Sequence, residues 1–78
     1  MTKYQITEEI YNENGDIIDS GERVTEDYAE AASIYECCKE MAKLTKETRT
    51  VSWYMATEHW TSLLETETIN PTRVIVLN

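Results

Sequence analysis

Residues 3–24, KYQITEEIYNENGDIIDSGERV, contain the stretch that decides the fold. Two runs rich in β-branched and aromatic residues flank Asn14-Gly15, a pair typical of the tight turns that join antiparallel strands. The pattern therefore predicts a β-hairpin. The register of the two strands decides which residues face the core, because a shift of one residue moves every side chain to the other face of the sheet.

Two registers are compatible with this turn. A two-residue type I′ turn at Asn14-Gly15 would pair Ile10 with Asp19 and scatter the apolar residues over both faces. A type I turn with Gly15 left-handed in a β-bulge would pair Ile10 with Ile18 and gather them on one face. We predict the second register. Its pairs are Asn12–Asp16, Ile10–Ile18, Glu9–Asp19 and Tyr4–Val24.

In the predicted register, Glu9 and Asp19 face each other beside Tyr11 on the side opposite the apolar residues. Like charges directly across a strand pair are destabilising. Because folding does not require this pair, it suggests a binding face.

Residues 25–46, TEDYAEAASIYECCKEMAKLTK, predict one α-helix. Thr25 or Asp27 can cap its start, acids fill its first turn, and lysines lie near its end, as the helix dipole favours. Helical spacing places seven apolar residues on or beside one stripe. They are Tyr28, Ala31, Tyr35, Cys38 and Ala42, with Ile34 and Met41 beside them.

Cys37 and Cys38 are the only cysteines, and they lie inside this helix. Adjacent helical residues diverge by about 100°, so the pair cannot close a disulfide or chelate one ion. We predict Cys38 in the core and Cys37 in solvent. With His59 they still fall short of a closed four-ligand zinc site, so we predict no metal site.

The second half of the chain predicts further strands. Residues 50–56, TVSWYMA, alternate with Val51, Trp53 and Met55 on one side. Residues 57–69 fit either a strand or a short helix capped by Thr57, and their threonines favour the strand. A turn at 70–72 precedes an apolar strand over 73–78. The predicted order is ββαβββ: one α+β domain over residues 1–78, with one helix on an antiparallel sheet of four to five strands.

The net charge of −8 comes entirely from the first half of the chain. Residues 1–40 hold eleven acids and three bases, whereas residues 41–78 hold four of each. Such a field repels nucleic acid and anionic membranes and attracts basic surfaces. We therefore expect no direct nucleic-acid binding and no membrane binding.

Catalytic signatures are lacking in the sequence. It has no glycine-rich phosphate loop and no nucleophile pattern around His59, and its acids lie in polar stretches where they stay ionised. We predict a protein that is not an enzyme and has no cofactor. No apolar run approaches the ~20 residues of a membrane span, and the start, MTKYQITEEIY, does not read as a secretory signal, so we expect a cytoplasmic location.

The order of a hairpin, the helix TEDYAEAASIYECCKEM and the strand TVSWYMA, over residues 3–56, resembles small phage-encoded inhibitors such as anti-CRISPR proteins, polymerase inhibitors and DNA mimics. That resemblance implies a protein that acts in the host cytoplasm by occupying a surface of a host or defence protein.

From the charge distribution and this resemblance we predict an acidic inhibitor that docks on a basic, nucleic-acid-binding surface. The alternative is a homodimer or larger homo-oligomer formed through residues 73–78, with acidity serving only solubility. The residues predicted to contact the partner are Glu9, Asp19, Glu22, Glu26, Asp27, Glu30, Glu36, Glu40, Tyr11 and Tyr54.

Overall fold

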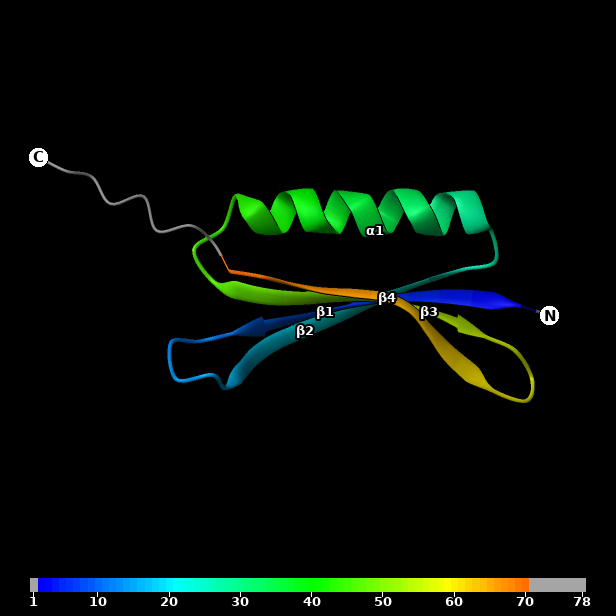
Figure 1. The fold of residues 1–78 in the computed structure, drawn as a ribbon, viewed down its shortest axis with the longest axis horizontal. Coiled ribbons are helices and arrows are strands. Elements are labelled where there is room, and N and C mark those ends of the chain that lie inside the picture. Colours follow the sequence, from blue (N-terminus) through cyan, green and yellow to red (C-terminus); the bar gives the residue numbers. More distant parts are fainter. Residues whose placement is uncertain (1, 71–78) are drawn as a thin grey trace, which may run out of the picture.

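The computed structural model of the protein describes residues 2–70, which form one antiparallel sheet with a helix on one side (Figure 1). The sheet has four strands in the order β2-β1-β3-β4. The predicted α+β architecture is confirmed as ββαββ, and the predicted strand over 73–78 lies outside the described residues. The elements are β1 (Lys3–Tyr11), β2 (Ile17–Thr25), α1 (Tyr28–Lys43), β3 (Thr48–Ala56) and β4 (Thr61–Ile69).

The turn between β1 and β2 is the predicted bulged turn. Gly15 has a φ of 84°, and its N–H donates to the carbonyl of Asn12 at 3.1 Å. The N–H of Asn12 donates to the carbonyl of Asp16 at 2.9 Å, and the Asn12 side chain accepts from the N–H of Asn14 and of Asp16. Glycine is suited to this position because it has no Cβ to oppose a positive φ.

The strand register beyond the turn differs from the prediction. Tyr11 lies opposite Ile17, but Ile10 lies opposite Asp19, so Ile18 is an extra residue in a second bulge. The turn is that of the predicted register, in which Asn12 pairs with Asp16. Beyond the bulge, the strands pair as in the type I′ register, in which Ile10 pairs with Asp19. The predicted Ile10–Ile18, Glu9–Asp19 and Tyr4–Val24 pairs are therefore wrong: Ile10 faces Asp19, Glu9 faces Ser20, and Tyr4 faces Thr25.

Both edge strands carry such a bulge near their hairpin turn. In β4 the pairing shifts between Trp53 and Tyr54, which leaves Leu64 as the extra residue. Residues 61–69 thus form the predicted strand, while the Thr57 hydroxyl accepts from the N–H of His59 and of Trp60 in the turn before it. Bulges interrupt the hydrogen-bonding edge of a sheet and reduce its tendency to pair with other strands.

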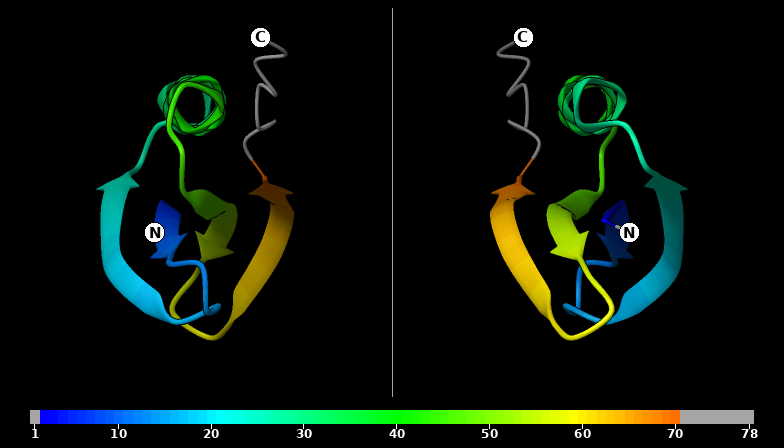
Figure 2. Two further views of the ribbon diagram at one scale, coloured as in Figure 1. Left: turned by 90° about the vertical axis from the view of Figure 1, so that its left-hand side faces the viewer. Right: turned by 90° about the vertical axis from the view of Figure 1, so that its right-hand side faces the viewer.

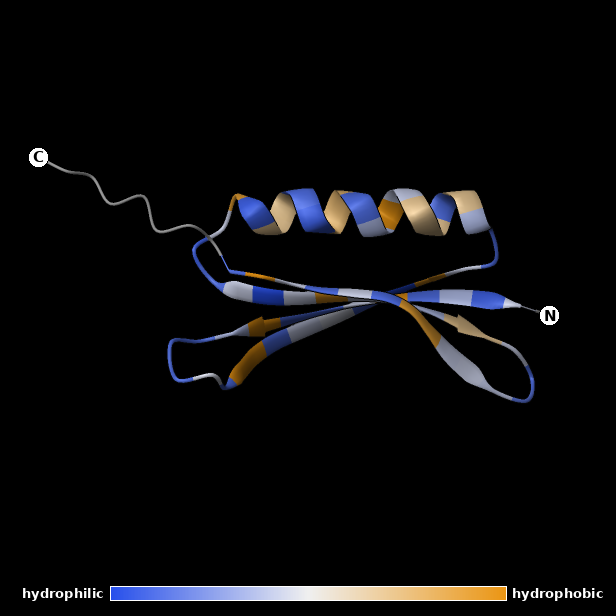
Figure 3. Ribbon diagram, viewed as in Figure 1, coloured by the Kyte–Doolittle hydropathy of each residue, from blue (hydrophilic) through white to orange (hydrophobic). Residues whose placement is uncertain are grey.

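The core lies between α1 and the two central strands. It is formed by Ile6, Ala31, Tyr35, Val51 and Trp53, and the rings of Tyr35 and Trp53 lie 5.6 Å apart. Figure 2 shows α1 on one side of the sheet only. Figure 3 shows hydrophobic and hydrophilic residues following one another along α1, as expected for a helix that buries one stripe.

The predicted helix stripe is only partly buried. Ala31, Tyr35 and Ala42 are buried, whereas Tyr28 and Met41 are each 58% exposed. Met41 lies about 80° from Ala31 around the helix axis, at the margin of the stripe. Tyr28 is the first helical residue, and its ring lies 5.2 Å from that of Trp53, so it covers the edge of the core while remaining largely exposed.

Candidate functional site

The side of the sheet turned away from α1, called the open face below, is built from alternate residues of the four strands. The strand registers place these residues in rows across the sheet. Written from β2 toward β4, four of these rows are Val24–Gln5–Tyr54–Leu63, Glu22–Thr7–Ser52–Thr66, Ser20–Glu9–Thr50–Thr68 and Ile17–Tyr11–Thr48. Two polar rows thus lie between two rows that contain aromatic and aliphatic side chains.

The β3–β4 half of the open face is a ladder of hydroxyl groups. The hydroxyls of Ser52 and Thr66 lie 2.8 Å apart, and those of Thr50 and Thr68 lie 3.0 Å apart. Ser52 is only 4% exposed although no helix covers it. Cross-strand hydroxyl pairs of this kind stabilise a sheet and satisfy their own hydrogen bonds.

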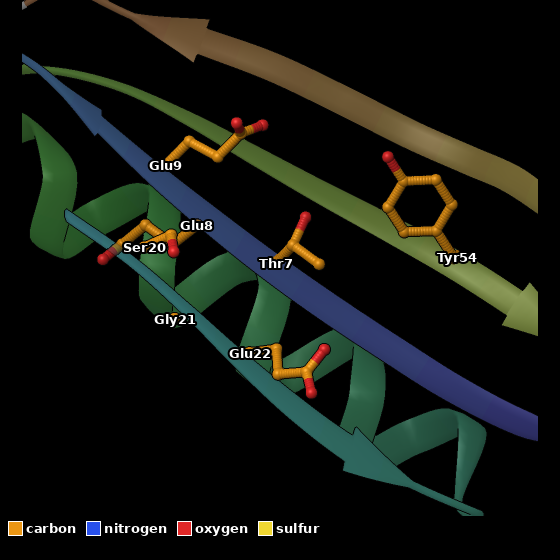
Figure 4. Close-up of a pocket in the computed structure, with 7 residues that line it drawn as sticks. All are labelled: Thr7, Glu8, Glu9, Ser20, Gly21, Glu22 and Tyr54. Atoms are coloured by element: carbon orange, nitrogen blue, oxygen red, sulfur yellow. The ribbon is translucent and has the colours of Figure 1, made fainter. Parts of the chain in front are cut away.

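The β1–β2 half of the open face carries carboxylates. Glu9 and Glu22 lie on either side of Thr7, with their side chains on the side of the strands away from α1 (Figure 4). The Gln5 amide donates to one oxygen of Glu22. Within residues 2–70, the Glu9 carboxylate has neither an ion pair nor a side-chain hydrogen bond. A shallow hollow at this place is lined by Thr7, Glu8, Glu9, Ser20, Gly21, Glu22 and Tyr54.

The basic residues of the folded part gather on the other side. Arg49 joins two carboxylates, with Nη1 at 3.0 Å from Glu8 and Nη2 at 3.2 Å from Glu47. Lys43 lies 3.0 Å from Glu40. On the open face, the described basic residue is Lys3, at the end of β1 opposite Ala56. The rows that hold Glu9 and Glu22 contain no cation.

Lys39 has the most elaborate surroundings of these cations. Its Nζ lies 3.0 Å from Glu36, 3.4 Å from Glu67 and 4.6 Å from the centre of the Tyr35 ring. The hydrogen bond that the Lys39 ammonium donates to Glu36 is the main cause that raises the pKa of Lys39 above its ordinary value, and Glu67 adds to the shift. This corner therefore holds its ammonium group between two carboxylates and an aromatic ring.

The ten residues predicted to bind a partner do not form one surface. Glu9, Tyr11, Glu22 and Tyr54 lie together on the open face. Asp19 lies on the opposite side of β2, because it pairs with Ile10 in a row of the helix side. The five others lie in or just before α1: Glu26, Asp27, Glu30, Glu36 and Glu40.

Most of the predicted acids around α1 have a role in folding. The Asp27 carboxylate caps the helix by accepting from the N–H of Ala29 at 2.8 Å and of Glu30 at 3.3 Å. Glu36 and Glu40 each form an ion pair with a lysine three residues later. Their negative charge is therefore partly compensated inside the fold.

Several open-face residues were missed by the sequence analysis. No binding role was predicted for Gln5, Thr7 or the hydroxyl ladder. Threonine at every second position, as at Thr66 and Thr68, nevertheless indicates a strand with one polar side. Their partners on β3 follow only from the strand pairing.

Both cysteines are free thiols in this structure: Cys37 is exposed, as predicted, whereas Cys38, predicted in the core, is half-buried and packs against it. Burial is the main cause that raises the pKa of Cys38. Over residues 2–70, no group of three or more His, Cys, Asp or Glu side chains is arranged to hold a metal ion. No helix in the same range is long and apolar enough to span a membrane.

Comparison of the chain with protein families, curated proteins and solved structures gives no match. The chemistry of the open face is therefore what indicates a function.

Proposed function

We propose that the protein is an acidic binding module whose open face docks on a basic surface of a partner protein, a surface that otherwise binds nucleic acid. One observation carries this proposal. Glu9 and Glu22 lie on an uncovered sheet face, in rows that contain no cation, whereas the basic residues Lys39, Lys43 and Arg49 on the helix side are paired with carboxylates. A positively charged partner would supply the missing charge.

The mechanism is electrostatic competition. Duplex DNA presents about one negative charge per 1.7 Å of its axis, and proteins bind it with arginine and lysine side chains. Carboxylates on the open face would occupy those side chains, and the net charge of −8 would speed the encounter. The half-buried rings of Tyr11 and Tyr54 lie in the outer rows and would supply short-range contacts. Inhibition of this kind uses no catalytic residue and no cofactor.

The acids around α1 contribute to the field rather than to the contact. Glu26 and Glu30 are exposed and, among the described residues, have no ion pair. They add negative charge on the side away from the docking face. Charge at that distance acts on the association rate and is screened within about 8–10 Å at physiological salt.

The test compares two variants that change the net charge equally on opposite sides of the molecule. Glu9→Gln/Glu22→Gln removes the open-face carboxylates, and the control Glu36→Gln/Glu40→Gln removes two on α1. Each protein is immobilised, exposed to nuclease-treated lysate of its own cell or its host, and eluted first with duplex DNA and then with stepwise salt.

We expect the wild type and the control to retain the same basic proteins, released by duplex DNA, and the open-face variant to lose them. Equal retention by both variants would contradict the proposed face. Retention that is indifferent to salt up to ~0.5 M would contradict the electrostatic mechanism. Recovery of the protein's own chain alone would instead favour the homo-oligomeric alternative, whose predicted segment, 73–78, lies outside the described residues.

A further inference from the structure

We infer that the cationic group received by the open face is an arginine guanidinium in preference to a lysine ammonium. This inference rests on the proposed docking function and specifies the chemistry of the partner. It is argued from how the chain holds its own cations on the other side of the sheet.

The chain shows two arrangements for a cation. In the first, Lys39 lies over the ring of Tyr35 and between two carboxylates that belong to α1 and β4, Glu36 and Glu67. In the second, Arg49 uses its two terminal nitrogens on different carboxylates, Nη1 on Glu8 of β1 and Nη2 on Glu47 before β3. In both cases two carboxylates from separate elements neutralise one partly buried cation.

The open face has two carboxylates from separate strands, as in both arrangements, and an aromatic ring, as in the first, but no cation. Glu9 and Glu22 come from neighbouring strands, and Tyr54 of β3 and Thr7 line the same hollow (Figure 4). Across the part of the chain that the structure describes, Tyr54 has no ring contact and no side-chain hydrogen bond. Its half-buried ring therefore has no aromatic partner there, and its hydroxyl has no side-chain hydrogen bond.

The spacing of these groups favours a forked cation. Glu9 and Glu22 are diagonal neighbours across the β1–β2 pair, a relation that places Cα atoms about 7–8 Å apart. A guanidinium has two outward pairs of N–H groups, so it can reach one carboxylate with each, as Arg49 does, and its plane stacks on an aromatic ring. An ammonium is a compact, strongly hydrated charge that gains less from such a site.

The experiment uses labelled oligo-arginine and oligo-lysine peptides of equal length and measures their affinity for the full chain by fluorescence anisotropy. For the wild type we expect oligo-arginine to bind more tightly by about threefold or more, the size of one additional exposed ion pair. The preference should weaken in Tyr54→Leu, which removes the stacking surface, and persist in Tyr54→Phe, which keeps the ring. The control Glu36→Gln/Glu40→Gln should keep it as well.

The outcomes separate the inference from the proposed function. Equal binding of both peptides, with affinity still lost in Glu9→Gln/Glu22→Gln, would overturn the arginine preference and leave the docking face in place. Affinity that is unchanged in Glu9→Gln/Glu22→Gln would overturn both. A preference that is undiminished in Tyr54→Leu would overturn the role of the ring. Circular dichroism of each variant confirms that it is folded.

Discussion

The two sides of the sheet differ in what their side chains do, even at adjacent positions of one strand. Trp53 faces α1 and is 6% exposed, while its neighbour Tyr54 faces away and has no ring partner among the described residues. Glu8 pairs with Arg49, while its neighbour Glu9 has no cation. The helix side thus concentrates the interactions that stabilise the fold, and the open face leaves Glu9 and Tyr54 without a cation or a ring partner among residues 2–70.

The largest effect is expected in the core. Trp53→Ala removes a buried ring that contacts Tyr4, Tyr28 and Tyr35, so it should lower the free energy of unfolding by about 3–5 kcal/mol. Tyr54→Ala, one position further on, should cost no more than about 1 kcal/mol. Urea unfolding followed by circular dichroism measures both. Similar losses for the two variants would show that the open face is structural as well.

Adjacent carboxylates provide the second comparison. Glu8→Ala leaves Arg49 with Glu47 alone in a partly buried place, so it should destabilise the protein by about 1–2 kcal/mol. Glu9→Ala should change stability by no more than about 0.5 kcal/mol, because it breaks no described ion pair and lowers the net negative charge. Urea unfolding measures the stability of both variants. A larger loss of unfolding free energy for Glu9→Ala than for Glu8→Ala would contradict the availability of Glu9 for a partner.

The third comparison is between Asp27, which caps α1, and its neighbour Glu26, which does not. Asp27→Ala should cost about 1 kcal/mol, because the N–H groups of Ala29 and Glu30 lose their acceptor. Glu26→Ala should have little effect on stability, since its side chain accepts no cap hydrogen bond in the described structure. Thermal denaturation of the two variants tests this. Equal effects would argue against Asp27 as the principal cap.

The smallest effect concerns pH. The carboxylates around Lys39 raise its pKa above the ordinary 10.5, so the folded state binds this proton more tightly than the unfolded state does. The resulting stabilisation is complete below pH 10.5 and is lost as the pH rises through the folded-state pKa. In Lys39→Met, stability should fall less steeply over that alkaline range than in the wild type. Parallel curves for the two proteins would show that the Lys39 ion pairs contribute nothing to stability.

Local patterns in the sequence were enough to predict the elements. Asn14-Gly15 indicated the bulged turn, Thr25 or Asp27 the start of the helix, and the alternation of Val51, Trp53 and Met55 a strand. Each of these signals depends on neighbours within a few residues, where turn chemistry, capping and side-chain period act directly.

The register of the first hairpin was predicted incorrectly for a physical reason. The sequence is compatible with a bulged-turn register and with a type I′ register. Because Ile18 is an extra residue, the structure has the turn of the first and the strand pairing of the second. Ile17 and Ile18 are 54% and 56% exposed, so apolar character alone did not identify the buried face. Bulges of this kind follow from how the whole sheet twists and pairs.

The sequence by itself determined the order of hairpin, helix and strands, the acidic first half of the chain and the absence of a recognisable catalytic motif. The tertiary structure decided which acids belong together. Glu9 and Glu22 lie beside Tyr54, whereas Asp19 lies on the other side of the sheet. Lys39 and Arg49 form ion pairs with carboxylates that are distant in sequence. Strand pairing and ion pairs join residues that are far apart along the chain, so local patterns cannot specify them.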